Sequence, residues 1–476
     1  MESNNYYQTT TLPYVNAEPH LGFALEIVQA DAIARYQRLQ GKGVFFNFGV
    51  DEHGLKIYRK AVEASKEPQV YCDEYAVKFE ALKKALNLSY NNFVRTTDER
   101  HIKAAREFWR KCNKNGDIYK KNYKTKYCVG CELEKTDSEL TDGRCPIHPN
   151  RELEIIEEEN YFFRFSKYQK PLLDFYDKTS RFVMPESKFN EIKAFVKSGL
   201  QDFSISRLKS KMPWGIDVPD DLEQVMFVWF DALVNYVSAI GWPDDMKEFK
   251  TWWPVVQFAG KDNLRQQAAI WQAMLMSAGL ANSKQIFIHG FITIDGQKIS
   301  KSLGNAINPI ELVEKYGTDP VRYYLLAKIS PFEDGDFSES KLKEVYNTDL
   351  AGGLGNLVAR VITLSSKFKV QSSKLASPEL AAAVEEAKQK TTKALEEFKF
   401  NEALSVIWQL ITFCDRYIDK TKPWEEKAGS EEVIADLLLT IKEISDLLLP
   451  FLPGTAGKIQ QQLLRNKKEI LFPRLA

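Results

Sequence analysis

The sequence of 476 residues predicts an α/β fold in which a parallel sheet is split by an inserted domain and followed by a helical bundle. Three observations support this prediction. β-rich runs alternate with longer segments of helical period over residues 1–115 and again over 216–338, as in parallel β-α-β sheets. Residues 116–215 interrupt this alternation, and residues 339–476 show helical periodicity throughout. We therefore expect four domains with these boundaries.

The predicted elements follow one another in a regular order. In the first half of the sheet, the β-rich runs are YYQTTTLPYV, VFFNFGV and NNFVRTT. They alternate with segments of helical period over 20–39, 54–86 and 98–114. The second half is predicted from VMFVWFDALVNYV, WPVVQFAGK, a helix over 262–279 and QIFIHGFITI. The bundle is predicted to contain amphipathic helices near 341–367, 377–398, 401–420, 430–448 and 454–465.

The composition narrows the class of protein. The chain has 65 Lys and Arg residues and 65 Asp and Glu residues, so a polyanionic partner must be bound by local basic surfaces and not by net charge. The first residues lack a basic-then-apolar signal, and the apolar runs are much shorter than the ~20 residues that cross a bilayer. We therefore expect a cytoplasmic protein without a membrane partner.

A cluster of cysteines and one histidine predicts a metal site. Cys128 and Cys131 in YCVGC are followed by Cys145 and His148 in CPIH, with thirteen residues between the two pairs. Thiolates and an imidazole at this spacing suit tetrahedral Zn²⁺, and four protein ligands would make the ion structural. A reduced knuckle that holds no metal is the alternative.

The stretch PHLGF, residues 19–23, is predicted to join the first strand to the helix over 20–39. Pro19 favours a first helical turn, and Gly22 lets a phosphate or a flat base approach the backbone. A helix N-terminus after a strand of an α/β sheet is a common site for phosphate, to which His20 would donate. Taken alone, His20 is more often a helix cap or a surface residue.

The stretch DGQKISKSLGN, residues 295–305, is predicted to be a basic loop bounded by glycines. Lys298 and Lys301 flank Ser300 in this loop. Two such cations can neutralise a triphosphate during displacement at its α-phosphorus. An ordinary solvated basic loop is the alternative.

Taken together, His20-Leu-Gly and Lys298-Ile-Ser-Lys301-Ser resemble the paired signature motifs of class I aminoacyl-tRNA synthetases, in the order of that family. TLPYVNAEPHLGF, VDEHG, ENYFFRFSKY, DFSISR, FVWFDALVNY, FAGKD, IHGF, KISKSLGN and KPW resemble the methionyl-tRNA synthetases in particular, over essentially the whole chain. The resemblance implies a Rossmann-type catalytic domain, a connective insertion with one zinc knuckle, and an anticodon-binding helical bundle. It also implies ATP with Mg²⁺, L-methionine and tRNA(Met) as ligands. No further barrel follows the bundle in this sequence, so we expect a monomer.

The resemblance also implies a role for individual residues. His20, Lys298 and Lys301 would be catalytic, and ATP would be bound by His20, Gly22, Phe23, Asp262, Lys298, Ser300 and Lys301. Methionine would be bound by Leu12, Tyr14, Asp51, Trp229, Ala232, Leu233, Tyr236 and His289, with Asp51 holding the α-ammonium group. Arg207 would shape the electrostatics of the active site. Phe23 departs from the family, in which the first motif usually ends in a second histidine.

Several of these residues also have a plain structural explanation. Trp229, Ala232, Leu233 and Tyr236 share one face of a predicted helix, and such a stripe is usually core. Asp51 could equally cap a strand end, and His289 could equally be a hydrogen-bonded core residue. The choice between these explanations rests on the resemblance.

The predicted helix spanning 347–366 has a buried stripe and an opposite polar face. Leu350, Leu354, Leu357, Val358 and Val361 form the stripe, whereas Asn356 and Arg360 lie four residues apart on the other face. GNLVAR resembles the helix of the family that reads the anticodon, and Trp424 resembles the tryptophan on which an anticodon base stacks. A solvated polar face and a structural tryptophan are the alternatives.

Three other functions remain open at this point. The first is a non-catalytic tRNA-binding paralogue, which Phe23 alone favours. The second is a class I synthetase for leucine or valine, although residues 116–215 look too short and too metal-like for an editing domain. The third is a small-molecule nucleotidyltransferase, which leaves the bundle unexplained.

Overall fold

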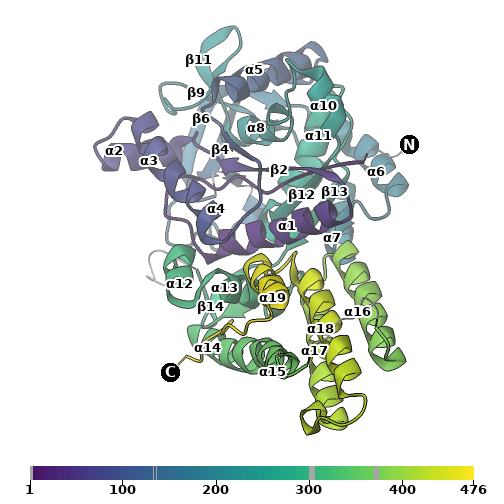
Figure 1. Cartoon of the computed structure of the whole chain (residues 1–476). Helices are drawn as coiled ribbons and strands as arrows, with labels where there is room; N and C mark the ends of the chain where they lie inside the picture. The colour runs from purple at the N-terminus through teal and green to yellow at the C-terminus, as the bar shows by residue number, and fades with distance from the viewer. Residues whose placement is uncertain (1–3, 132, 136, 300–305, 369–374, 476) are drawn as a thin grey trace. The chain divides into compact units, whose positions relative to one another are not determined.

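The computed structural model describes residues 4–131, 133–135, 137–299, 306–368 and 375–475 (Figure 1). The chain divides into two compact units, each built from three stretches of sequence. The first unit joins Met1–Glu18, Gly43–Ala81 and Tyr90–Ile288, and the second joins Pro19–Lys42, Leu82–Ser89 and His289–Ala476. The four predicted domain boundaries stay a prediction.

The first unit contains a six-stranded sheet with the strand order β3-β2-β1-β12-β13-β7. In that order the strands are Asn92–Arg95, Gly43–Val50, Asn5–Thr9, Val255–Gly260, Gln285–His289 and Val183–Met184. β1 pairs in parallel with β2 on one side and with β12 on the other, so strands from both predicted halves meet at β1. Every residue of β12 is buried, as in parallel sheets covered on both faces. The predicted parallel-sheet α/β fold is confirmed.

The helices of the first unit surround a core rich in aromatic side chains. Phe108 stacks on Trp271 with ring centroids 5.5 Å apart, and it meets Phe230 and Trp242 edge-on. The helices are α2 (Leu55–Glu63), α3 (Pro68–Glu80), α5 (Glu99–Lys114), α6 (Gln169–Lys178), α7 (Glu186–Lys197), α8 (Val228–Leu233), α9 (Asn235–Ser238), α10 (Met246–Trp252) and α11 (Trp271–Ser277).

Two predicted segments of helical period are divided in the structure. The segment over 54–86 forms separate helices, because Ser65 adopts a left-handed φ of 54° and Pro68 begins a new helix, α3. The predicted helix over 262–279 starts in the 3-10 turn Lys261–Asn263, passes through a π-helical turn, Gln266–Ile270, and becomes α-helical in α11. In both places the sequence has helical periodicity, but the backbone changes direction or pitch within it.

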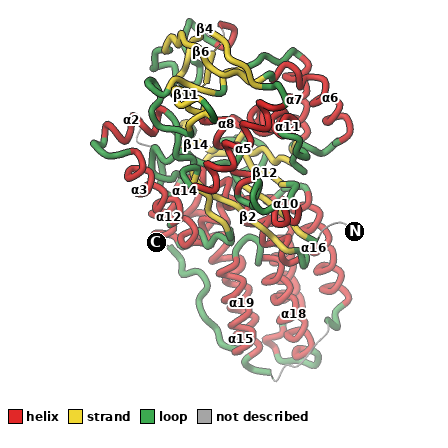
Figure 2. The backbone as a smooth tube through the Cα atoms, turned by 90° about the horizontal axis from the view of Figure 1, so that it is seen from above, coloured by secondary structure: helices red, strands yellow, loops and turns green. Residues whose placement is uncertain are grey.

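The inserted segment forms its own antiparallel sheet in the order β5-β4-β6-β8. Its two long strands, β4 and β6, are labelled in Figure 2. These strands are Leu133–Lys135, Ile118–Cys128, Glu154–Phe163 and Phe203–Ser204, and a smaller sheet consists of β9 (Ser206–Leu208), β10 (Asp217–Val218) and β11 (Asp221–Met226). The acidic run EIIEEEN lies on β6, where Glu157 faces Lys124 of β4 and forms an ion pair of 2.8 Å. The acidic run of the predicted insertion therefore faces a basic side chain on the neighbouring strand.

The second unit combines the long helix α1, a small sheet and the helical bundle. Its first elements are α1 (Leu21–Leu39), α4 (Leu82–Ala85), β14 (Ile292–Ile294), β15 (Gln297–Lys298), α12 (Pro309–Tyr316), α13 (Thr318–Ala327), β16 (Gly335–Phe337) and α14 (Glu339–Val345). The bundle consists of a π-helical segment (Tyr346–Gly355), α15 (Asn356–Ser365), α16 (Pro378–Glu396), α17 (Phe400–Thr421), α18 (Ser430–Leu448) and α19 (Pro453–Arg465) (Figure 1). The predicted helical bundle is confirmed.

A buried arginine connects the parts of the second unit. Arg322 of α13 forms an ion pair of 2.8 Å with Asp31 of α1, and both side chains are fully buried. The same guanidinium donates to the carbonyls of Leu86, Pro450 and Phe451. Since a buried charge is tolerated only when it is paired and hydrogen-bonded, Arg322 holds α1 and the turn before α19 together. Among the described residues, no helix is long and apolar enough to span a membrane.

Candidate active site and metal centre

The N-terminus of α1 is closed by the side chain of His20. His20 is the N-cap in an extended conformation, and its Nδ1 accepts a hydrogen bond of 3.1 Å from the backbone N–H of Gly22. A Cβ on residue 22 would lie only 3.0 Å from Cε1 of His20, so an edge of the imidazole lies close against the glycine. The ring of Phe23 stacks on the same imidazole, with centroids 4.2 Å apart and planes 26° from parallel.

The described residues on either side of the basic loop belong to the second unit, and those after it contact this helix start. β15 ends at Lys298, whose backbone pairs with Thr293 of β14. After the loop, the carbonyl of Ile307 accepts a hydrogen bond of 3.1 Å from the N–H of Leu21, the first residue of α1. The structure therefore brings Ile307, two residues after the loop, to the residue that follows His20. Ser300 and Lys301 lie outside the described residues.

Several residues predicted to bind methionine lie together in the first unit. Tyr14 pairs with Asp51 in an isolated parallel bridge, in which the N–H of Asp51 donates to the carbonyl of Pro13. The Tyr14 ring meets the ring of Trp229 edge-on, with centroids 6.5 Å apart. Leu12 lies two residues before Tyr14 in the same half-buried segment. These residues come from the ends of two neighbouring strands and from the start of α8.

The rest of the predicted stripe is more deeply buried. Ala232 and Leu233 lie on α8 and Tyr236 on α9, and Leu233 and Tyr236 belong to the hydrophobic core of the first unit. The hydroxyl of Tyr236 accepts a hydrogen bond of 2.7 Å from Nε2 of Gln267. Leu233 and Tyr236 therefore pack in the core behind the candidate methionine-binding residues.

A buried network of one carboxylate and two imidazoles lies behind this group and was missed by the sequence reasoning. Asp231 of α8 accepts from Nδ1 of His53 at 2.5 Å and from Nε2 of His101 at 2.7 Å. Burial opposes ionisation, but the charge of His53 and the hydrogen bonds from both rings outweigh it and lower the pKa of Asp231 to about 2. His53 stands in VDEHG, only two residues after Asp51, and its N–H approaches Oδ1 of Asp51 at 3.4 Å.

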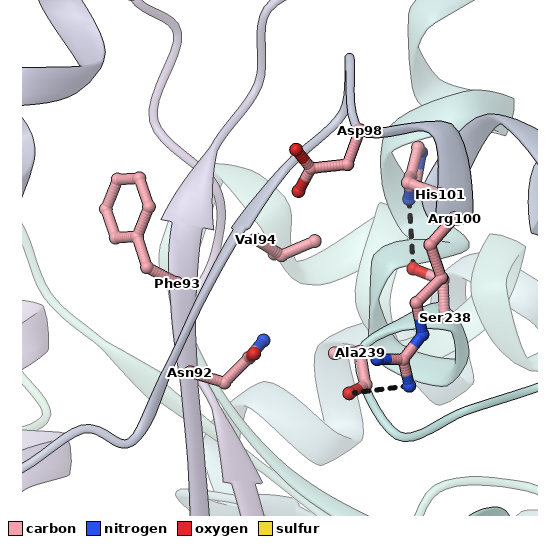
Figure 3. Close-up of a pocket in the computed structure, with 8 residues that line it drawn as sticks. All are labelled: Asn92, Phe93, Val94, Asp98, Arg100, His101, Ser238 and Ala239. Carbon is pink, nitrogen blue, oxygen red and sulfur yellow. Dashed lines mark hydrogen bonds between the residues drawn. The ribbon is translucent and has the colours of Figure 1, made fainter.

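The outer side of this network borders a small hollow beside β3 (Figure 3). Nδ1 of His101 lies 3.0 Å from the hydroxyl of Ser238, and both side chains line the hollow together with Asn92 and Asp98. His101 is 1% exposed, so it forms a wall of the hollow without opening the network to water.

His289 belongs to the second unit, although it was predicted to bind methionine with the residues above. Its Nδ1 donates to the carbonyl of Gly290 at 2.7 Å, because a carbonyl can only accept. Its Nε2 lies 2.9 Å from Oε2 of Glu26 on α1, within hydrogen-bond distance. His289 is therefore firmly oriented.

Arg207 and Asp262 occupy different environments in the first unit. Arg207 is buried with its guanidinium 4.5 Å from the ring centroid of Phe227 and 5.2 Å from that of Tyr127, and it donates to the hydroxyl of Ser204. A charge held between rings has a fixed place beside α8, which begins after Phe227. Asp262 is exposed and follows β12 in the turn Lys261–Asn263, at the carboxyl end of a central strand.

The four predicted metal ligands converge. The ligand atoms of Cys128, Cys131, Cys145 and His148 all lie within 4.8 Å of one another. Sγ of Cys131 lies 3.4 Å from Sγ of Cys145 and 3.2 Å from Nδ1 of His148. A Cβ on Gly130 would meet the imidazole of His148 at 2.5 Å, so only glycine fits beneath that ring. The donor set and its spacing fit one tetrahedral Zn²⁺ ion.

The knuckle is packed against the candidate methionine residues. Tyr127 and Val129, at the end of β4, share a small core with Phe227 and Val228, and Tyr14 and Trp229 pack against it. Nζ of Lys56 donates to the carbonyl of Gly130 at 3.3 Å and lies 5.4 Å from the ring centroid of Tyr14. The knuckle therefore packs against one side of Tyr14 and Trp229, two of the candidate methionine-binding residues.

The residues predicted to read the anticodon lie on the bundle. Asn356, the first residue of α15, is exposed, whereas Arg360 is held by Asp415 at 2.9 Å and Asp419 at 2.8 Å, both on α17. Trp424 follows α17 and is 42% exposed, which is unusual for a side chain of its size. All five residues of the predicted stripe are buried, at 1% exposure or less.

Comparisons with known families agree with this fold and these sites. The family model described as tRNA synthetases class I (M) matches residues 6–153 and 136–362, and the anticodon-binding domain of tRNA ligase matches residues 379–474. Together with the parallel sheet, the capped start of α1 and the helical bundle, these matches define the chain as a class I aminoacyl-tRNA synthetase.

Individual relatives show which amino acid the matching synthetases are named for. The chain is 43% identical to a methionine–tRNA ligase of Thermosynechococcus vestitus, covering 97% of this chain and 90% of that protein. It is 39% identical to a chloroplastic/mitochondrial methionine–tRNA ligase of Arabidopsis thaliana, covering 97% and 78%. The structure of Mycobacterium tuberculosis methionyl-tRNA synthetase in complex with methionyl-adenylate matches with a TM-score of 0.92 at 34% identity, over 99% of this chain and 100% of that one. The chain belongs to the methionyl-tRNA synthetases.

Proposed function

We propose that this chain activates L-methionine with ATP and Mg²⁺, forming methionyl-adenylate and pyrophosphate, and then transfers the methionyl group to the 3′ end of tRNA(Met). Such a methionine–tRNA ligase serves both initiation and elongation of translation. Family membership supports the overall reaction. The observation that carries the chemistry is the hydrogen bond from Leu21 to Ile307, because it joins the start of α1 to the segment that follows the lysine-bearing loop.

The first step needs positioning and charge stabilisation more than it needs a base. The methionine carboxylate is already ionised when it attacks the α-phosphorus, so no proton has to be removed from the nucleophile. Because Nδ1 of His20 accepts from Gly22, the neutral ring carries its proton on Nε2 and can donate it to a phosphate oxygen. Lys298 and Lys301 supply positive charge to the leaving pyrophosphate, and Ser300 and Asp262 bind the nucleotide.

Methionine is bound by an aromatic and aliphatic group with one carboxylate. Asp51 binds the α-ammonium group, and Tyr14 and Trp229 pack against the polarizable thioether. Leu12, Ala232, Leu233, Tyr236 and His289 complete the set of methionine-binding residues. Arg207 fixes a positive charge beside α8.

The remaining parts serve the RNA and the fold. Asn356, Arg360 and Trp424 contact the anticodon, for which Arg360 exchanges its two aspartate partners for base edges. One structural Zn²⁺ ion bound by the knuckle holds the insertion in shape. We also propose that the protein is cytoplasmic and acts as a monomer. Sedimentation of the purified enzyme tests its oligomeric state.

One experiment separates this function from its rivals. ATP–pyrophosphate exchange is measured with each of the twenty amino acids, and charging is then measured with tRNA(Met) and with an anticodon-altered tRNA. We expect exchange with methionine alone and charging that requires the methionine anticodon. Exchange with leucine or valine would identify another class I synthetase, and tRNA binding without any exchange would identify a non-catalytic paralogue.

A further inference from the structure

The first signature motif of this chain ends in phenylalanine, and the structure gives that residue a specific contact. Phe23 lies on the first turn of α1 and stacks on the imidazole of His20, with centroids 4.2 Å apart and planes 26° from parallel. Both rings are half-buried. A phenyl ring donates no hydrogen bond, so any contribution of Phe23 must come from its shape and its face.

His20 is held by its own motif at one edge and on one face. The N–H of Gly22 fixes the Nδ1 edge of the ring, and Gly22 lies so close to this edge that a Cβ would be 3.0 Å from Cε1. The hydrogen bond alone fixes one atom of the ring, and the stack with Phe23 fixes its plane. Together the contacts determine where the Nε2–H of His20 points.

From this geometry, we propose that Phe23 is a positioning residue that holds the plane of His20 for the activation step. The inference rests on the proposed catalytic role of His20. It explains how the chain can lack the usual second histidine, because an imidazole and a phenyl ring can supply the same flat face. The property required at position 23 is then an aromatic ring and not an N–H group.

The experiment measures ATP–pyrophosphate exchange in Phe23→Leu, Phe23→Tyr and Phe23→His, with the intact enzyme. Phe23→Leu keeps apolar volume but removes the stack, and we expect kcat to fall about 10-fold to 10²-fold while KM for methionine stays within about two-fold. Phe23→Tyr and Phe23→His keep a ring, and we expect both to retain kcat within about three-fold. Tyr75→Leu is the matched control, because it removes a stack of similar geometry, on Tyr71 of α3.

A double variant separates positioning from direct contact. In the His20→Ala background, Phe23→Leu should produce no further loss, because the phenyl acts only through the imidazole. If the double variant loses the product of the two single losses in kcat and its KM for ATP rises, Phe23 binds the nucleotide itself. That result would overturn the inference. A gain of ten-fold or more in Phe23→His would also overturn it, since the N–H would then be what matters. If His20→Ala is as active as the parent, the proposed role of His20 fails, and that outcome is distinct from a silent Phe23→Leu.

Discussion

Replacing Asp231 by asparagine tests the buried network behind the candidate methionine residues. The change keeps the size of the side chain but removes the charge that two imidazoles share. The asparagine amide has one acceptor oxygen and one donor NH₂ group, and the NH₂ group would face an imidazole N–H. At least one of the two buried hydrogen bonds to His53 and His101 is therefore lost. We expect the first unit to be destabilised and α8, which carries Trp229, to lose its fixed position.

The size of the effect follows from the pKa of Asp231. The folded value of about 2 lies below the ordinary value of 3.8, so the ionised carboxylate contributes stability that is fully present above about pH 4 and is lost as the pH falls through 2. The difference corresponds to about 2 kcal/mol of unfolding free energy at neutral pH. A loss of this size lowers the thermal midpoint of a unit of this length by about 4–8 °C.

The assay is scanning calorimetry of the parent and Asp231→Asn at pH 7 and at several values between pH 4 and 3, together with KM for methionine. We expect a lower midpoint at pH 7, a weaker dependence on pH in the acid range, and a raised KM. Asp174→Asn is the control, because it breaks an exposed ion pair with Lys170 that contributes about 0–1 kcal/mol. An unchanged midpoint and an unchanged acid slope in Asp231→Asn would refute the reasoning.

Three further predictions concern the other sites. Gly22→Ala places a Cβ 3.0 Å from Cε1 of His20, so we expect ATP–pyrophosphate exchange to fall by about 10²-fold with no loss of thermal stability, because alanine favours the helix; normal exchange would contradict this. Removal of zinc by a chelator should lower the thermal midpoint and expose three titratable thiols, and zinc but not magnesium should reverse both; metal analysis that finds no zinc in reduced protein would end the prediction. Trp424→Ala should raise KM for tRNA about 10-fold or more and spare adenylate formation, whereas equal losses in both assays would indicate a structural tryptophan.

The sequence predicted those features that depend on local spacing. The four metal ligands lie within 21 residues of one another in two short pairs, and the structure brings all four together. The parallel sheet was predictable from alternating runs, and the buried stripe of α15 and the segment before it from helical periodicity. Each of these signals is contained in a short window of sequence.

Features that depend on distant residues were not predictable from local patterns. His53, His101 and Asp231 stand on three different segments, and no local pattern marks them as partners, although His53 lies within the quoted VDEHG. The two-residue strand β7 was missed because so short a run carries no periodic signal. The partners of Arg360 were also missed, although Asp415 and Asp419 lie four residues apart on one helix face, which is a signal that could have been used.

The central claim is that the start of α1 and the lysine loop act on one triphosphate. The most direct test is methionine-dependent ATP–pyrophosphate exchange in His20→Ala, Lys301→Ala and the double variant, with methionine binding measured by calorimetry. We expect each single variant to lose about 10²-fold or more in exchange while methionine binding stays nearly intact, and the double variant to lose far less than the product of the two. Losses that multiply, or exchange that survives Lys301→Ala, would contradict the claim.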